Sequence, residues 1–241
     1  MILEKQDQTI EVPKLSSPLA FDFETIANED IVGKLPEPKP DSRLKDPEKI
    51  KADIEKKKAK AVDKMPLNPN TARIVACGFA GVRADSGELW QDCLVMTRQT
   101  GEAYLLYRIW DCLAESKLFV TFNGNGFDLP MLLRRGMALN IIPAVTIARG
   151  RYDIPPKGNH YDLLQILSSF GSMETGGLDG ICKAVLGVGK TIEGAGESDQ
   201  IGELWKQGKL EEIGKRASHD AGLTLQLWLK ARGVYFDQPA I

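Results

Sequence analysis

The sequence has no long hydrophobic run. A helix that crosses a membrane needs about 18 consecutive apolar residues, and the most apolar stretch, residues 137–148, is shorter and contains Asn140, Pro143 and Thr146. The first 15 residues include charged side chains throughout, so they lack the apolar segment of a signal peptide. We therefore expect a cytoplasmic protein that does not contact a membrane.

Cysteine is scarce, and basic residues are not in excess. The four cysteines lie far apart with no C-x-x-C pair, which favours free thiols in the core over a zinc or redox site. The chain of 241 residues has 31 basic against 33 acidic side chains and a net charge of −2. Proteins that bind nucleic acid through bulk charge are basic. Any binding of nucleic acid here would therefore need a local patch or bound metal ions.

Hydrophobic patterning predicts an α/β fold with a mixed sheet flanked by helices. Strands are predicted at 19–24, 73–82, 88–96 and 118–122, and helices at 99–115, at about 127–136 and over most of the chain from residue 161. The turn residues Asp85-Ser86-Gly87 predict a hairpin between the second and third strands. Strands that alternate with helices are typical of this fold class. We expect a single domain over residues 1–241, with its core at about 17–232.

Residues 27–70 interrupt this pattern and predict a charged helical insertion. Pro36, Pro38 and Pro40 indicate an extended segment, and Asp46-Pro47 is typical of a helix N-cap followed by proline at the first helical position. Between residues 41 and 64, nine basic and six acidic side chains give a charge of +3. The segment is either a solvated helix held by ion pairs along its surface or a basic arm that touches phosphates near an active site.

Two carboxylates share one face of the first predicted strand. Asp22 and Glu24 are two residues apart, so their side chains point the same way. Carboxylates that converge from a central strand are costly unless something neutralises them. Oxygen ligands of this kind suit Mg²⁺ or Mn²⁺. The alternative is a strand end where both acids meet solvent.

Two further acids follow at characteristic places. The segment Phe122-Asn123-Gly124-Asn125-Gly126-Phe127-Asp128 follows a strand and opens a helix, which places Asp128 near a helix N-terminus. Asp220 precedes an apolar helical run. Taken alone, Asp128 could be an acid favoured by the helix dipole, and Asp220 could be a surface residue.

In this order, the motifs D-x-E, F-N-G-x-x-F-D and a late helical Asp resemble the DEDD exonuclease superfamily of ribonuclease-H-like fold. Within it, the sequence is similar to the predicted 3′→5′ exonucleases related to the proofreading domain of family B DNA polymerases, many of them from phages. The segments 160–163, 178–179 and 186–187 are similar to intervening parts of that group. The resemblance covers about residues 17–232.

The resemblance implies hydrolysis of DNA, mainly single-stranded, from its 3′ end with two divalent ions, Mg²⁺ or Mn²⁺. Asp22, Glu24 and Asp220 would hold the ion that activates the attacking water. Asp22 would bridge to the second ion, supported by Asp128 directly or through water. Two ions about 3.5–4 Å apart can stabilise both the attacking and the leaving oxygen.

The resemblance also implies contacts with the substrate. The backbone around Thr25 would meet the terminal 3′-hydroxyl, and Asn123 and Phe127 would place the last nucleotide. Lys190 follows a Leu-Gly pair, where this group often has a lysine near the substrate. Replication or repair proteins would be partners in trans. A ribonuclease on the same scaffold is an alternative, because nothing in the sequence marks discrimination of a 2′-hydroxyl.

One position departs from the superfamily pattern. A Tyr four residues before the last Asp, or a His five before it, normally orients the water, but this chain has Arg216 and Lys215 there. Arg216 could meet the scissile phosphate but is a poor base. His219 is either catalytic or a surface or capping histidine. On a regular helix it points about 100° away from Asp220, so a catalytic role would need a local irregularity of the helix. A non-catalytic subunit that binds nucleic acid is therefore a further alternative, and His160 is expected to be structural.

Residues 184–191 resemble a phosphate-binding P-loop only in part. The first glycine is absent, and the preceding residues 179–185 predict a helix where a P-loop follows a strand. A helix that ends at Gly187 explains the pattern better. An NTPase is therefore disfavoured.

Overall fold

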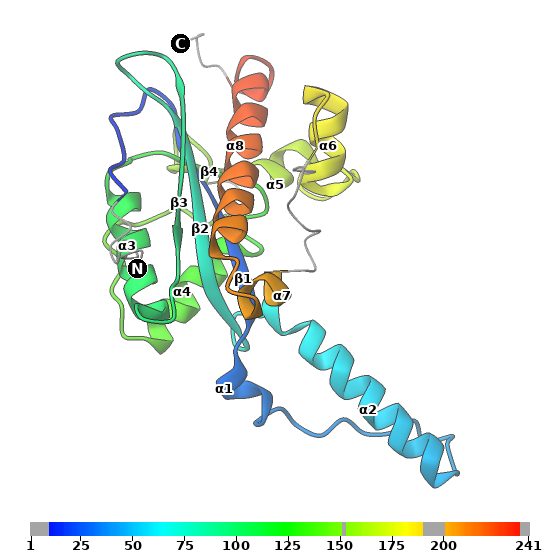
Figure 1. Cartoon of the computed structure of the whole chain (residues 1–241). Coiled ribbons are helices and arrows are strands. Elements are labelled where there is room, and N and C mark those ends of the chain that lie inside the picture. Colours follow the sequence, from blue (N-terminus) through cyan, green and yellow to red (C-terminus); the bar gives the residue numbers. More distant parts are fainter. Residues whose placement is uncertain (1–9, 151–152, 190–200, 237–241) are drawn as a thin grey trace.

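A computed structural model describes residues 10–150, 153–189 and 201–236 of the chain. Its centre is a five-stranded sheet of order β3-β2-β1-β4-β5 (Figure 1). The strands are β1 (Leu19–Ala27), β2 (Ala72–Val82), β3 (Leu89–Val95), β4 (Phe119–Thr121) and β5 (His160–Asp162). Strands β1, β2 and β3 pair antiparallel, whereas β1, β4 and β5 pair parallel. This mixed sheet confirms the predicted fold class, and the hairpin between β2 and β3 is also confirmed.

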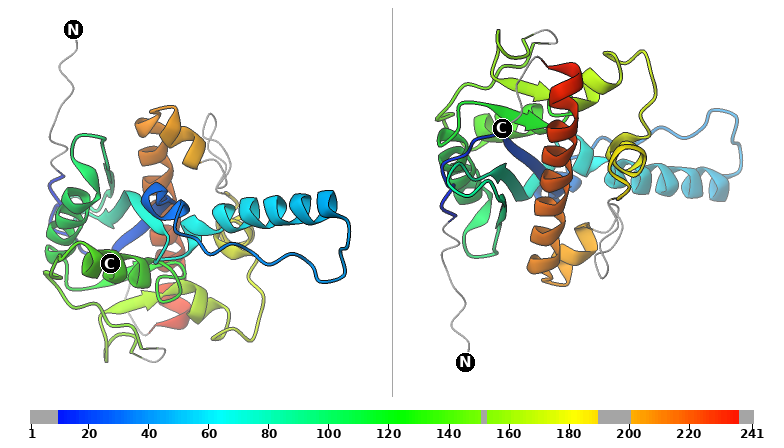
Figure 2. Two further views of the ribbon diagram at one scale, coloured as in Figure 1. Left: turned by 90° about the horizontal axis from the view of Figure 1, so that it is seen from below. Right: turned by 90° about the horizontal axis from the view of Figure 1, so that it is seen from above.

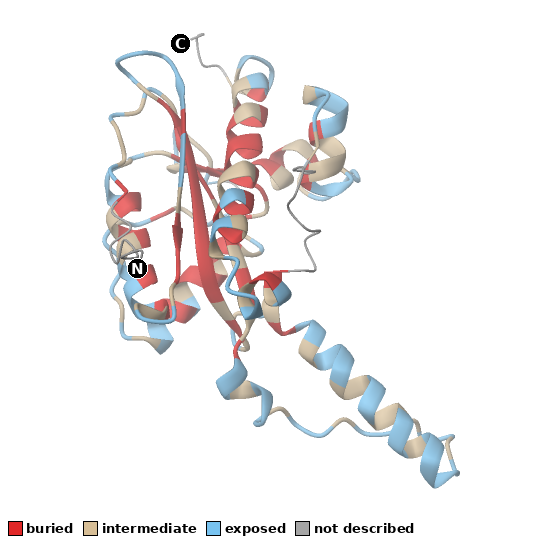
Figure 3. Ribbon diagram, in the orientation of Figure 1, coloured by how far each residue is buried: buried red, intermediate tan, exposed pale blue. Residues whose placement is uncertain are grey.

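Helices cover both faces of the sheet. Helices α3 (Gly101–Ala114) and α4 (Asp128–Ala138) lie on one face, and the long helix α8 (Leu210–Tyr235) crosses the other (Figures 1 and 2). The short helices α5 (Leu163–Leu167), α6 (Gly177–Leu186) and α7 (Ile201–Lys206) pack beside α8. Phe21 and Phe119, which are fully buried, fill the core between the sheet and α3. Strands β1, β2, β4 and β5 and the sheet-facing side of α8 are among the most buried parts of the described chain, whereas β3 is partly exposed (Figure 3).

The expectation of helical structure from residue 161 was wrong at its start. His160, Tyr161 and Asp162 form β5, which extends the sheet beside β4. A strand of three residues is too short to show a two-residue hydrophobic period, and it runs directly into α5. Tyr161 is buried against Trp228 of α8, with ring centroids 5.9 Å apart, so β5 also helps to hold the C-terminal part of α8 in place.

Helix α6 precedes the P-loop-like residues, as predicted. It ends at Gly187, whose φ of 73° lies in the left-handed region that favours glycine. No strand leads into this segment, so the described part of it has the wrong structure for a P-loop.

The segment between β1 and β2 forms an arm, defined here as residues 28–71. It contains α1 (Glu29–Val32), α2 (Pro47–Asp63) and the 3₁₀ turn η1 (Met65–Leu67), and α2 extends away from the sheet (Figures 1 and 2). Helix α2 begins as predicted, because the Asp46 side chain accepts a hydrogen bond from the Glu48 amide. None of its residues is buried. The arm therefore joins the core only at its base, where Met65 is buried.

The four cysteines, all in the described part of the chain, are present as thiols and not as disulfides, as predicted. Burial raises the pKa of the Cys93 and Cys112 thiols to about 11 and raises that of Cys77 well above its usual range. These three thiols therefore stay protonated near neutral pH and act as small apolar groups of the core. Among the helices that the structure describes, none is long and apolar enough to cross a membrane.

Candidate active site

Strand β1 separates apolar and acidic side chains onto its two faces. Phe21 and Phe23 pack into the core that contains α3 and α4, whereas Asp22 and Glu24 point to the face covered by α8. This follows from the two-residue period of a strand. The strand pairing shifts register between Glu24 and Thr25. An irregularity of this kind re-aims the side chains beside it and is common next to active sites.

Small residues on β2 leave room for the acids. In the antiparallel register, Asp22 lies opposite Gly78 and Glu24 lies opposite Ala76. A Cβ atom at Gly78 would overlap the Ala217 carbonyl of α8. The backbone of α8 therefore rests directly on β2 beside Asp22, which is how a helical residue can reach the strand.

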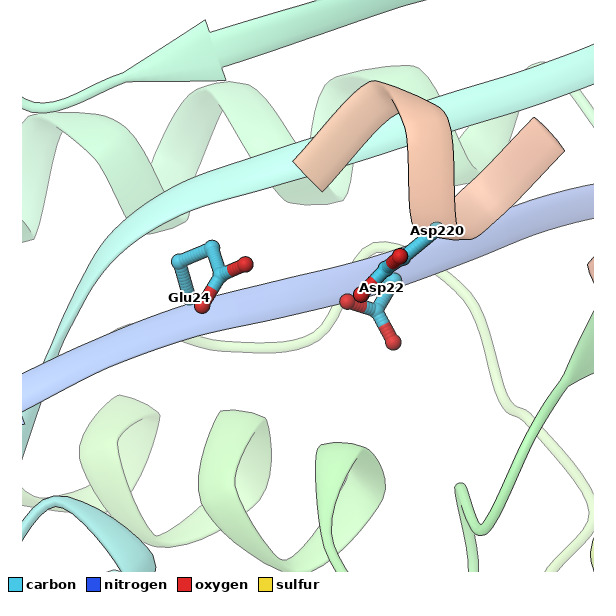
Figure 4. A group of neighbouring side chains, drawn as sticks. All are labelled: Asp22, Glu24 and Asp220. Atoms are coloured by element: carbon cyan, nitrogen blue, oxygen red, sulfur yellow. The ribbon is translucent and has the colours of Figure 1, made fainter. Parts of the chain in front are cut away.

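This close approach brings Asp220 to the two strand carboxylates. Asp22, Glu24 and Asp220 each offer one oxygen, and these oxygens all lie within 4.8 Å of one another (Figure 4). Asp220 is buried, and Asp22 and Glu24 are partly buried. We call these three residues the carboxylate cluster. Oxygen ligands from three carboxylates suit a hard divalent cation such as Mg²⁺ or Mn²⁺, so the residues present fit the metal that the resemblance implies.

One basic side chain lies against the carboxylate cluster. Arg216, one turn before Asp220 on α8, places Nε 3.3 Å from Oε1 of Glu24. Both side chains are largely shielded from solvent, with 9% and 13% of their area exposed. Arg216 therefore partly neutralises the cluster. The sequence analysis suggested that Arg216 could meet the scissile phosphate, but it did not predict the pairing of Arg216 with Glu24.

Asp128 lies next to the carboxylate cluster but is not a member of it. Its Oδ1 accepts a hydrogen bond of 3.1 Å from the backbone amide of Phe23, between Asp22 and Glu24. It is almost fully buried at the first residue of α4, where the helix dipole favours a negative charge. Asp128 thus fixes the strand segment that carries two of the three clustered acids.

The loop before α4 is held by an acid that the sequence analysis missed. Asp162 accepts hydrogen bonds from the backbone amides of Asn123 (3.0 Å) and Asn125 (2.9 Å). Asn123 has a φ of 71°, which asparagine tolerates better than most residues. Burial raises the pKa of Asp162, and these amides oppose that rise. The His160-Tyr161-Asp162 segment was noticed in the sequence, but its role in shaping this loop was not.

The other residues predicted to touch the substrate have the following surroundings. The Thr25 hydroxyl donates a hydrogen bond of 2.8 Å to the Pro66 carbonyl in η1. Phe127 packs against the main core as a partly buried side chain. His219 is partly exposed, and its Nε2 lies 3.4 Å from the Gly189 carbonyl. Lys190 lies outside the described residues.

His160 has the structural environment that was expected of it. Its Nε2 lies 2.8 Å from the Thr121 hydroxyl and its Nδ1 lies 3.1 Å from the Ala148 carbonyl. Burial lowers its pKa to about 4, so the ring is neutral at physiological pH. It joins β5 to β4 and to the segment at Ala148 that precedes β5.

Substitution of Gly78 tests whether close packing of α8 assembles the cluster. In Gly78→Ala, the added methyl group would overlap the backbone of Ala217 and Ser218, so α8 must move away from β2. We expect a loss of about 1–3 kcal/mol in the free energy of unfolding, measured by urea denaturation, together with weaker binding of Mn²⁺ measured by calorimetry. Gly33→Ala is the control, because no atom lies near the added methyl group. Unchanged Mn²⁺ affinity in Gly78→Ala would contradict this view of the site.

The mixed sheet, its two helical layers and the acids on β1 and α8 together define an α/β domain of ribonuclease-H-like fold. Among solved structures, the family B DNA polymerase from the hyperthermophilic archaeon Pyrobaculum calidifontis matches 94% of this chain with 27% of its own. The TM-score is 0.59 and the sequence identity is 18%, so this likeness concerns the fold.

Sequence comparisons identify the family. A family model described as "Predicted 3'-5' exonuclease related to the exonuclease domain of PolB" matches residues 66–235. DNA polymerase 1 of Pyrococcus abyssi is 30% identical over an alignment of 125 residues, and the match covers 46% of this chain and 15% of that protein. The DNA polymerase of Thermococcus aggregans is 25% identical over 123 residues, covering 46% of this chain and 7% of that protein. The chain belongs to the family of predicted 3′–5′ exonucleases related to the exonuclease domain of PolB.

These matches cover only part of the relatives and only part of the candidate active site. The chain spans only 15% or less of these two archaeal polymerases. The family match begins at residue 66, so β1 with Asp22 and Glu24 lies outside it. The place of these two acids in the site therefore rests on their approach to Asp220.

Proposed function

We propose that this protein hydrolyses single-stranded DNA from its 3′ end and releases nucleoside monophosphates with the help of two divalent ions, Mg²⁺ or Mn²⁺. The observation that carries the proposal is the convergence of Asp22, Glu24 and Asp220 on the covered face of β1. Family membership supports exonuclease chemistry. DNA is favoured over RNA as substrate because the named relatives are DNA polymerases.

The proposed roles follow from where each side chain lies. Asp22, Glu24 and Asp220 would hold the metal, and Asp128 would support Asp22 while it fixes β1 through the Phe23 amide. When bound, divalent ions would supply the positive charge that attack on a phosphodiester requires.

Residues around the carboxylate cluster would hold the DNA end. The backbone at Thr25 would meet the terminal 3′-hydroxyl, and Asn123 and Phe127 would place the last nucleotide. Arg216 offers a guanidinium beside Glu24 for the scissile phosphate. Lys190 would contact the substrate, and replication or repair proteins would be the partners in trans.

The direct test is digestion of a 5′-labelled single-stranded DNA oligonucleotide with Mg²⁺, with Mn²⁺ or with EDTA. We expect a ladder that shortens from the 3′ end with either metal, no products in EDTA, and slower cleavage of an RNA of the same sequence. Asp22→Ala should give no ladder, whereas Asp92→Ala, an exposed acid on β3, should match the wild type. Failure to cleave either polymer with any metal would refute the proposal and favour a binding subunit.

His219 is examined in the same assay. If His219 transfers a proton during the reaction, His219→Ala should cleave DNA much more slowly than the wild type. If His219 only supports the loop at Gly189, as its 3.4 Å contact with the Gly189 carbonyl indicates, His219→Ala should cleave DNA at close to the wild-type rate. The proposal includes His219 as a catalytic residue only if the first result is obtained.

A further inference from the structure

One face of α2 faces the returning chain of the arm. The Lys57 ammonium donates a 2.9 Å hydrogen bond to the Lys39 carbonyl and pairs with Asp53 at 2.7 Å. Lys58 pairs with Glu37 at 3.1 Å. These contacts hold the helix against residues 37–39. Both lysines are paired with acidic side chains of the arm itself. The contacts also determine which face of α2 is left to the solvent.

The flank of α2 next to these contacts carries exposed lysines that we call the outer lysine face. Its members are Lys49, Lys56, Lys60 and Lys64. At 3.6 residues per turn these positions lie within about 80° of one another, and they span about 22 Å along the axis. All four are exposed, and none forms an ion pair with another residue in the described parts of the chain.

The outer lysine face begins beside the candidate active site. The end of α2, with Val62 and Asp63, lines a cavity of about 720 Å³ at the base of the arm. Thr25, which follows Glu24 of the carboxylate cluster, lines the same cavity. Trp205 of α7 also lines it and is only partly buried, so it offers an aromatic surface on which a base can stack. Lys64 directly follows α2 at this end, and the other three lysines lead away from it along the arm.

We propose that the outer lysine face binds phosphates of the DNA strand upstream of its 3′ end. The proposal rests on the proposed function, because it takes single-stranded DNA as the ligand. Four exposed lysines along one flank of the helix, none in an ion pair with another described residue, match the regular charge of a nucleic acid backbone. A chain with a net charge of −2 needs such a local patch to hold a polyanion. The arm would then keep the strand in place while its end lies at the carboxylate cluster.

The test compares two variants that remove the same charge. The first replaces all four lysines of the outer lysine face with alanine. The control replaces four exposed lysines of the core that have no ion pair with another described residue, namely Lys14, Lys117, Lys157 and Lys230. Binding of a fluorescent single-stranded DNA oligonucleotide is measured by anisotropy in EDTA, where metal-dependent cleavage cannot occur. Alanine favours helices, so circular dichroism should show α2 intact in the first variant.

The arm variant should bind DNA at least tenfold more weakly than the wild type, and the control should bind like the wild type. Each phosphate contact on a single strand contributes about −0.7 to the slope of log affinity against log salt concentration, so the arm variant should lose about 3 from that slope. Equal binding by both variants would overturn the proposal, and this would also be the result if the arm docks an acidic protein instead. Absence of binding by the wild type would overturn it as well.

The result is separable from that for the proposed function. A wild type that binds DNA through the arm but cleaves no DNA with any metal would retain the arm proposal and refute the exonuclease. A wild type that cleaves DNA, while the arm variant binds as well as the control, would retain the exonuclease and refute the role of the arm.

Discussion

The Asp220→Asn variant is expected to lose phosphodiester hydrolysis almost completely while folding at least as stably as the wild type in EDTA. Metal ions contribute several kcal/mol of transition-state stabilisation, and each 1.4 kcal/mol is worth a factor of ten. We therefore expect the rate with Mg²⁺ to fall about a thousandfold or more. Asparagine has nearly the same shape as aspartate, so the change removes a charged ligand and little packing.

The stability half of this prediction follows from the charge of the cluster. Three carboxylate oxygens lie within 4.8 Å of one another, and the guanidinium of Arg216 pairs with one of the three residues. Asp220 is the most buried member of the cluster, so solvent screens its charge least. Loss of one negative charge should therefore raise the free energy of unfolding in EDTA by about 1 kcal/mol.

Thermal denaturation with and without Mn²⁺ checks the stability and the metal binding, and digestion of the labelled oligonucleotide checks the rate. A ligand present at about 100 times its Kd stabilises the native state by about 2.7 kcal/mol, so Mn²⁺ should raise the Tm of the wild type clearly. It should raise that of Asp220→Asn much less, while the exposed control Asp92→Asn should follow the wild type. An Asp220→Asn protein that keeps its metal-dependent activity would show that the cluster is not the active site.

Local patterns predicted the parts of the fold that depend on local sequence. The alternation along β1 placed Asp22 and Glu24 on one face, and Asp46-Pro47 placed the start of α2 at the residue where it begins. The predicted strands and helices agree with the structure to within a few residues at most ends. These successes share a cause, because each depends on side chains that are near one another in the chain.

Contacts between residues far apart in the chain could not be predicted from local sequence patterns. The closeness of α8 to β2 depends on Gly78 lying opposite Asp22 in the strand register, and no local pattern gives that register. The link from Asp162 to the loop at Asn123 joins residues 39 positions apart. From the sequence, only the resemblance to a known family predicted that Asp220 lies close to Asp22 and Glu24. The pairing of Arg216 with Glu24 was not foreseen, because the resemblance to the superfamily implies a tyrosine, not an arginine, at this position.

The second large effect is expected at that pair. In Arg216→Met, Glu24 would lose its cationic partner while it remains beside Asp22 and Asp220. Removal of one partner from a buried ion pair costs about 3–5 kcal/mol, and because Glu24 keeps some exposure we expect a loss of about 3 kcal/mol in the free energy of unfolding in EDTA. Methionine preserves much of the length and apolar character of the side chain, so most of this loss would be electrostatic.

Divalent metal should reverse this loss, because a cation can replace the neutralising charge of Arg216. Removal of a positive charge next to a cation site also lowers the electrostatic cost of binding, so Mn²⁺ should bind Arg216→Met about tenfold more tightly than the wild type. Urea denaturation in EDTA and in Mn²⁺, with calorimetric titration of Mn²⁺, measures both effects. The control is Lys215→Met on the same helix, whose pair with Glu211 is exposed and should contribute little to stability. If Mn²⁺ stabilised Arg216→Met no more than the wild type, Arg216 would not be the charge that balances the cluster before metal binds.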